Sequence, residues 1–86
     1  MLEVRLTRGY FRTARRVAPP GSHEARQLAK VLRGLQEEPV PNEQDARALI
    51  PPVVECWERT VPSTMLSVLF TREADRVLVR GVRSRS

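Results

Sequence analysis

The chain has 86 residues, a hydrophobic content of 41% and a formal net charge of +5 at pH 7. A chain this short supports only one core, so residues 1–86 are expected to form a single domain. With one Trp, one Tyr and two Phe, that core must consist mainly of Leu and Val. A deep cavity for a small-molecule cofactor is therefore not expected.

The single cysteine, Cys56, has no partner for an internal disulfide, and His23 is the only histidine, so a metal site is not expected. We interpret Cys56 as a small buried hydrophobic residue and His23 as an exposed surface residue. No stretch resembles the apolar part of a signal peptide or the roughly 20 apolar residues of a membrane span. The sequence therefore predicts a cytoplasmic protein that does not contact a membrane.

The positive charge is concentrated in two parts of the sequence. Residues 1–16 carry five Arg against Glu3, and residues 72–86 carry five Arg against Glu73 and Asp75. Almost all the cations are arginines, whose side chains suit bidentate contact with phosphate or carboxylate. This predicts a basic face that binds an anionic partner. A compositional bias from a high-GC genome remains the alternative.

The chain opens with alternating apolar and polar residues, the pattern of a strand with one buried face. Leu2, Val4 and Leu6 would form that face. From residue 8 the apolar spacing becomes helical, which predicts a short helix that ends at the proline-rich segment 18–21.

A second helix is expected to begin at Ser22, which suits an N-cap, with Glu24 in the first turn where a negative charge complements the helix dipole. The helix should run to about Glu38 and bury one apolar stripe. The members of that stripe are Ala25, Leu28, Ala29, Leu32 and Leu35.

Prolines frame the next segment, which can contain at most a short helix over 42–49 with Asn42 as its cap. We treat this segment as a connector. Three strands follow, over 53–61, 65–71 and 76–83, with two hairpin turns between them. The predicted fold is α+β in the order β-α-α-β-β-β, with a helical hairpin on one face of a small, mostly antiparallel sheet and the other face available to a partner.

The sequence lacks a Gly-rich phosphate loop, paired carboxylates on one face, and a Ser or Cys with an available His base. Its chemistry lies in the arginines of the last strand, where Val77 and Val79 occupy one face. Such arginines can bind a phosphate backbone, or stabilise the charge that develops on phosphate when a 2′-hydroxyl attacks it. The alternative is an edge strand that is charged to prevent aggregation. The other face carries Arg76, Leu78 and Arg80, and Arg83 and Arg85 follow near the end of the sheet.

Three segments of the C-terminal third are informative: Cys56-Trp57-Glu58-Arg59, Leu66-Ser67-Val68-Leu69-Phe70 and a last strand that closes in Gly81-Val82-Arg83. Together with the element order, they resemble the RelE/ParE superfamily of bacterial toxins. The resemblance implies a toxin of a type II toxin–antitoxin module, neutralised by an antitoxin whose acidic segment lies over the basic sheet. In the RelE branch it implies an mRNA interferase, a ribosome-dependent endoribonuclease that acts on translated mRNA.

The resemblance also implies site residues. Arg83 matches the arginine that follows the last glycine of the family's final strand, and is the first catalytic candidate. Arg59 is the second, although alternation places it on the face of Trp57 and Val61 unless a bulge near residue 62 turns it outward. The expected RNA-binding residues are Arg80, Arg85 and Arg76.

Three positions depart from the pattern of these nucleases. Glu58 and Thr60 stand where the family has basic residues, and Ser67 stands where it has arginine. A C-terminal tyrosine has no counterpart either. Two further functions therefore remain open within the family: a ParE-like inhibitor of DNA gyrase, and a catalytically degenerate protein of the same fold.

A third alternative belongs to another class of protein. A winged-helix DNA-binding protein would have two helices over 42–60, the second beginning near Pro51 and Pro52, and a wing over 65–83. Its recognition helix would present Glu55 and Glu58 to phosphate, which counts against it.

Overall fold

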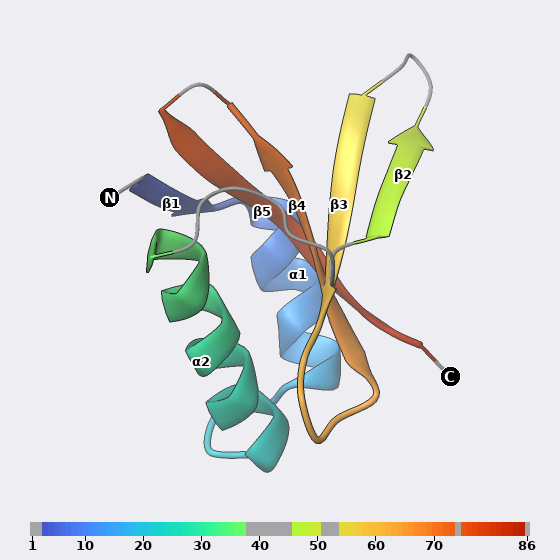
Figure 1. The fold of residues 1–86 in the computed structure, drawn as a ribbon. Helices are drawn as coiled ribbons and strands as arrows, with labels where there is room; N and C mark the ends of the chain where they lie inside the picture. The colour runs from blue at the N-terminus through green and yellow to red at the C-terminus, as the bar shows by residue number, and fades with distance from the viewer. Residues whose placement is uncertain (1–2, 38–45, 51–53, 74, 86) are drawn as a thin grey trace.

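A computed structural model describes residues 3–37, 46–50, 54–73 and 75–85 of the chain. They form two helices on one side of a five-stranded sheet (Figure 1). The predicted α+β class and the packing of both helices on one face are confirmed. In chain order the elements are β1 (Glu3–Leu6), α1 (Arg8–Val17), α2 (His23–Glu37), β2 (Ala46–Ile50), β3 (Val54–Thr60), β4 (Leu66–Arg72) and β5 (Arg76–Ser84).

The strands lie in the order β1-β5-β4-β3-β2, so the first and last strands of the chain are neighbours. β1 runs parallel to β5, and the other pairs are antiparallel. The parallel pairing extends from Glu3 opposite Arg76 to Leu6 opposite Val79. β1 therefore pairs with only the first part of β5. Beyond Val79, the backbone groups on this edge of β5 have no neighbouring strand to bond with among the described residues.

Helix α1 lies along this part of β5 instead. Thr7 caps it by accepting a hydrogen bond from the Tyr10 N–H (3.3 Å), and the Thr7 hydroxyl donates to the carbonyl of Val79 (2.7 Å). One turn later, Thr13 Oγ1 accepts a hydrogen bond from the Val82 N–H (2.9 Å). A helix side chain thus satisfies a strand edge that would otherwise present an unpaired backbone donor.

Helix α2 begins as predicted, because Ser22 Oγ accepts a hydrogen bond from the Ala25 N–H (3.1 Å). Its apolar stripe differs in one position. Val31 is buried, whereas Ala29 is exposed, because Val31 stands three residues after the buried Leu28 and so shares its side of the helix. The predicted stripe was therefore wrong at Ala29.

The first strand is only partly buried. Val4 packs against the core, but the side chain of Leu6 is 38% exposed, since β1 lies at the edge of the sheet. The prediction that Leu6 would be buried was wrong, and Leu2 lies outside the described residues.

The predicted connector contains an additional strand. Ala46–Ile50 pairs antiparallel with β3, from Ala46 opposite Glu58 to Ile50 opposite Val54, so the predicted helix over 42–49 was wrong for these residues. Pairing with β3 overrides the helical preference of the local sequence. Asn42, its predicted cap, lies outside the described residues.

These two strands also exclude the winged-helix alternative. That fold requires a recognition helix where the structure has β3, Val54–Thr60. The remaining strands lie within one or two residues of their predicted positions.

The core lies between the helices and the covered face of the sheet, and the opposite face is called the open face below. Phe70, Val77 and Val79 of the sheet are almost fully buried, and Leu28 and Leu35 of α2 contribute to the same cluster. Within the described ranges, neither helix is both long and apolar enough to cross a membrane.

Candidate nucleic-acid interface

The direction of Arg83 depends on a bulge in β5. Leu69 of β4 lies opposite Gly81, but the next residue, Phe70, lies opposite Val79, so Arg80 is an extra residue on β5. An extra residue reverses the alternation of side chains beyond it. Uninterrupted alternation would place Arg83 on the same face as Val79, whereas the bulge turns it to the open face.

On the open face, Arg83 lies opposite Ser67, and its guanidinium donates a hydrogen bond to the carboxylate of Glu58 on β3. This ion pair spans β4. The Arg83 side chain remains 59% exposed, while that of Glu58 is 17% exposed. The hydrogen bond and charge of Glu58 raise the pKa of the Arg83 guanidinium, so it stays protonated. An accessible cation therefore stands beside a sheltered carboxylate.

Arg80 belongs to the same group. Its side chain is exposed, and Nε donates a hydrogen bond to Thr71 Oγ1 (3.2 Å), next to β5 on the open face. No carboxylate within the described part of the chain forms an ion pair with it. Arg80 and Arg83 thus both lie on the open face, and of the two only Arg83 has a carboxylate partner among the described residues.

The other two predicted RNA-binding residues lie at opposite ends of β5. Arg85 is exposed, and its guanidinium donates a hydrogen bond to the carbonyl of Thr64 in the β3–β4 hairpin. Arg76 forms an ion pair with Glu73 (2.7 Å), whose hydrogen bond raises the pKa of the Arg76 guanidinium, and Asp75 also raises it. The acidic surroundings of Arg76 are unfavourable for binding phosphate.

Arg59 lies on the covered face, away from this group. It is 9% exposed, stands opposite Val68, and places its guanidinium 5.6 Å from the ring centroid of Phe70. This is the face that alternation assigns to it, since the β3–β4 pairing is regular from Trp57 to Thr60. The catalytic role of Arg59 stays a prediction, and the geometry supports a packing role better.

Replacing Arg59 by alanine should lower the free energy of unfolding by about 1–2 kcal/mol, because the variant loses a desolvated cation–π contact and the packing of the side-chain stem. Urea unfolding measures the change. If Arg59→Ala instead leaves stability intact and abolishes activity, the catalytic assignment is correct.

Sequence reasoning treated two residues only as departures from the family pattern. Glu58 is the partner of Arg83 across β4, which only the strand register reveals. Ser67 is fully buried on the open face, and its hydroxyl has no hydrogen-bond partner among the described residues. An unpaired buried hydroxyl costs free energy of folding.

Cys56 and His23 occupy the environments expected of them. Cys56 is buried, and desolvation raises the pKa of its thiol, an effect that Arg80 opposes and Glu58 reinforces. His23 is exposed. Across the described ranges, no three His, Cys, Asp or Glu side chains gather as metal ligands.

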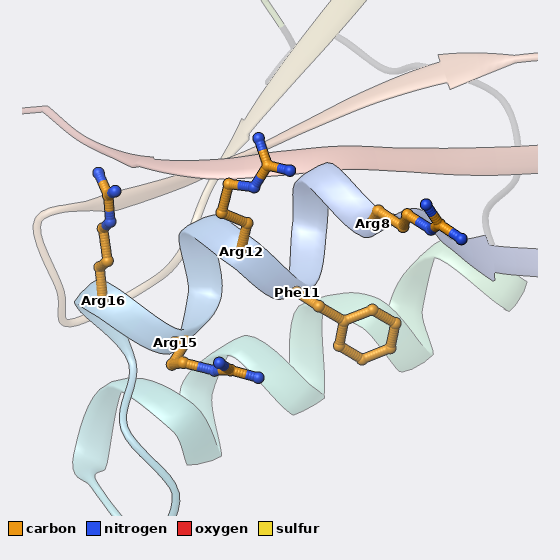
Figure 2. Close-up of a pocket in the computed structure, with 5 residues that line it drawn as sticks. All are labelled: Arg8, Phe11, Arg12, Arg15 and Arg16. Carbon is orange, nitrogen blue, oxygen red and sulfur yellow. The ribbon is translucent and has the colours of Figure 1, made fainter.

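A second basic surface lies on α1. Four arginines and the exposed Phe11 line a depression of about 440 Å³. Figure 2 shows Arg12 and Arg16 on one flank of the helix and Phe11 and Arg15 on the flank toward α2. Within the described residues, none of the four arginines forms an ion pair with a carboxylate. The excess of arginine in residues 1–16 was evident from the sequence, but its position on one helix was not assigned a role. These residues are Arg8, Arg12, Arg15 and Arg16.

Comparison with known proteins gives a match at the level of the fold. No protein-family model and no curated protein matches the sequence. Among solved structures, a copper-bound mutant toxin from Helicobacter pylori is similar, with a TM-score of 0.66, 15% identity, and coverage of 98% of this chain and 94% of that chain. The solution structure of the conserved hypothetical protein HP0894 from Helicobacter pylori is also similar, with a TM-score of 0.64, 14% identity and the same coverage.

Proposed function

We propose that this protein is the toxin of a type II toxin–antitoxin module and inhibits translation by cleaving mRNA on the ribosome. The observation that carries the proposal is the Arg83–Glu58 pair on the open face. The fold is shared over nearly the whole chain with a structure described as a toxin. The resemblance of the last strand to the RelE branch points to RNA as the substrate.

The pair supplies the two groups that cleavage by 2′-hydroxyl attack requires. A bond forms between the 2′ oxygen and phosphorus, and the bond from phosphorus to the 5′ oxygen breaks. Glu58 accepts the proton of the 2′-hydroxyl. Arg83 and Arg80 stabilise the negative charge that develops on the phosphate oxygens. The departing 5′ oxygen takes a proton from water, which leaves a 2′,3′-cyclic phosphate and a 5′-hydroxyl.

The partner that silences such a toxin would be an antitoxin with an acidic segment. Arg80 and Arg83 expose positive charge on the open face, and acidic side chains laid over them would compensate it. The same segment would exclude RNA from the Arg83–Glu58 pair.

The test is expression of the chain alone in a bacterial host. Growth should stop, and primer extension should find new 5′ ends within translated transcripts. The matched control is the same transcript without its start codon, which should remain intact because it is not translated. Growth arrest without new 5′ ends would exclude mRNA cleavage.

Inhibition of DNA gyrase is the second candidate, and one observation favours it. The neighbours of the pair on the open face are neutral, namely Ser67, Leu69 and Thr60, so the surface is poor in the cations that RNA requires. A supercoiling assay with purified gyrase tests this directly. Loss of supercoiling at micromolar protein would support this candidate, and full supercoiling would exclude it.

A further inference from the structure

We infer that α1 carries a second RNA-binding surface, which binds the phosphate backbone of RNA beyond the strand that lies on the open face. It consists of Arg8, Arg12 and Arg16, together with Phe11 and Arg15, and is called the α1 arginine face below. The inference deepens the proposed function and rests on it, because it adds a contact to the same class of substrate.

The packing of α1 fixes where its arginines point. Gly9 and Thr13 face β5, and Tyr10 is buried in the core. Around the helix, Arg12 and Arg16 lie beside Thr13, on the side opposite Tyr10. Figure 2 shows the side chains of Arg12 and Arg16 projecting away from α2. Because α2 lies on the covered side of the sheet, these arginines lie toward the open-face side.

This position places the α1 arginine face next to the candidate site. Gly9 lies against the carbonyl of Arg80, and Thr13 accepts a hydrogen bond from the N–H of Val82, one residue before Arg83. A nucleic-acid strand on the open face that passes over the edge of β5 therefore meets α1. The arginines of the helix extend the anionic binding surface beyond Arg80 and Arg83.

The spacing along the helix suits a repeating anion. Arg8, Arg12 and Arg16 are separated by four residues each, which puts their Cα atoms about 6 Å apart along one side of the helix. No described carboxylate neutralises them, although an exposed arginine commonly pairs with one when acidic residues are near. A row of positive charges without carboxylate partners can bind the successive phosphates of a nucleic-acid backbone.

Phe11 distinguishes RNA from an acidic protein segment as the occupant. Its ring is 54% exposed and lines the same depression as the arginines, where it can stack on an unpaired base. The α1 arginine face includes no aliphatic side chain, whereas an amphipathic protein helix needs an apolar strip. The apolar depression beside α1, lined by Leu6, Tyr10 and Ala14 among others, also includes Phe11 and Arg15, so it borders the α1 arginine face on the flank nearer the core.

The test compares the triple variant Arg8→Gln/Arg12→Gln/Arg16→Gln with the wild-type chain. The probe is fluorescein-labelled single-stranded oligouridine of about 20 nucleotides, longer than one typical single-strand site. Fluorescence anisotropy over a series of salt concentrations gives the affinity and its salt slope. Losing three phosphate contacts should reduce the slope by about 2 and weaken binding on the order of 100-fold at about 0.1 M salt. Phe11→Leu should weaken binding about tenfold with no change in slope.

The control is Arg26→Gln/Lys30→Gln/Arg33→Gln, which removes the same charge from the exposed side of α2. Glutamine forms helices about as well as arginine, so both triple variants should fold. If the two triple variants weaken RNA binding equally, the loss of net charge alone explains the effect, and the inference is overturned. Unchanged RNA binding in the α1 variant would also overturn the inference. If that variant instead lost binding to polyglutamate, the occupant of the surface would be an acidic protein segment.

A third variant separates this inference from the proposed function. If Arg80→Gln/Arg83→Gln loses oligouridine binding and the α1 variant does not, the inference fails and the proposed function stands. If the α1 variant loses binding while the wild-type chain produces no new 5′ ends in translated mRNA, the α1 arginine face stands and cleavage does not.

Discussion

Replacing Arg83 by alanine should slow mRNA cleavage by about 10²–10³-fold, the effect of removing one preorganised group that stabilises developing negative charge. The guanidinium is largely exposed, so its removal should lower the free energy of unfolding only slightly, through the loss of its ion pair with Glu58. The measurement is single-turnover cleavage of an mRNA bound to purified ribosomes, with urea unfolding of the same preparation. In a bacterial host, the variant should no longer arrest growth.

The control for this prediction is Arg5→Ala. Arg5 is an exposed arginine of β1 that forms an ion pair with Glu3, so its replacement makes the same change in net charge away from the pair on the open face. It should cleave at close to the wild-type rate. Wild-type cleavage by Arg83→Ala would show that Arg83 is not the group that stabilises the phosphate.

Glu58→Gln extends the same experiment to the proposed base. It should slow cleavage by about 10²–10⁴-fold, because glutamine has the shape of glutamate but cannot accept the proton. The double variant Arg83→Ala/Glu58→Gln should be little slower than the slower single variant, since two groups that act on one step lose their effect together. A faster Glu58→Gln enzyme would instead identify Glu58 as a carboxylate that masks Arg83.

Replacing Gly9 by alanine should lower the free energy of unfolding by about 3 kcal/mol, at the upper end of the cost of overpacking. An added Cβ would lie 2.7 Å from the carbonyl oxygen of Arg80, a backbone atom that cannot turn aside. Helix α1 would have to move away from β5 and lengthen the hydrogen bond between Thr13 and Val82. Urea unfolding with a fixed m-value measures the loss.

Gly34→Ala is the matched control, because Gly34 also lies inside a helix. An added Cβ there meets no atom within 4 Å. The substitution should raise the free energy of unfolding by about 0.5–1 kcal/mol, the ordinary preference of a helix for alanine over glycine. Replacing glycine by alanine should thus lower the free energy of unfolding at position 9 and raise it at position 34. Stabilisation by both would mean that α1 does not approach β5 as closely as described.

The sequence was sufficient for those elements in which local pattern and tertiary packing agree. The cap at Ser22, the buried Leu28 and Leu35 and the alternation of Val77 and Val79 follow from periods of 3.6 and 2. The additional strand β2, Ala46–Ile50, could not be predicted, because its residues have no strand pattern of their own. They become a strand by pairing with β3.

Only the arginines of the candidate site were predictable from the sequence, and its geometry was not. The Gly81-Val82-Arg83 ending identified Arg83, yet its direction depends on the bulge at Arg80, which no period in the sequence indicates. The partnership of Arg83 with Glu58 depends on the register of β3 and β4. Register is a non-local property, so the sequence presented Glu58 only as a missing cation.

The parallel pairing of β1 with β5 also has a consequence for how the chain folds. Glu3 and Arg76 are 73 positions apart, and β5 lies between β1 and β4. Pairings between residues so distant in sequence form slowly, because the chain must first close a long loop. The complete sheet cannot assemble until β5 has been synthesised, and Arg83 reaches Glu58 only then. Under the proposed function, the chain therefore acquires its active pair only in the last stage of folding.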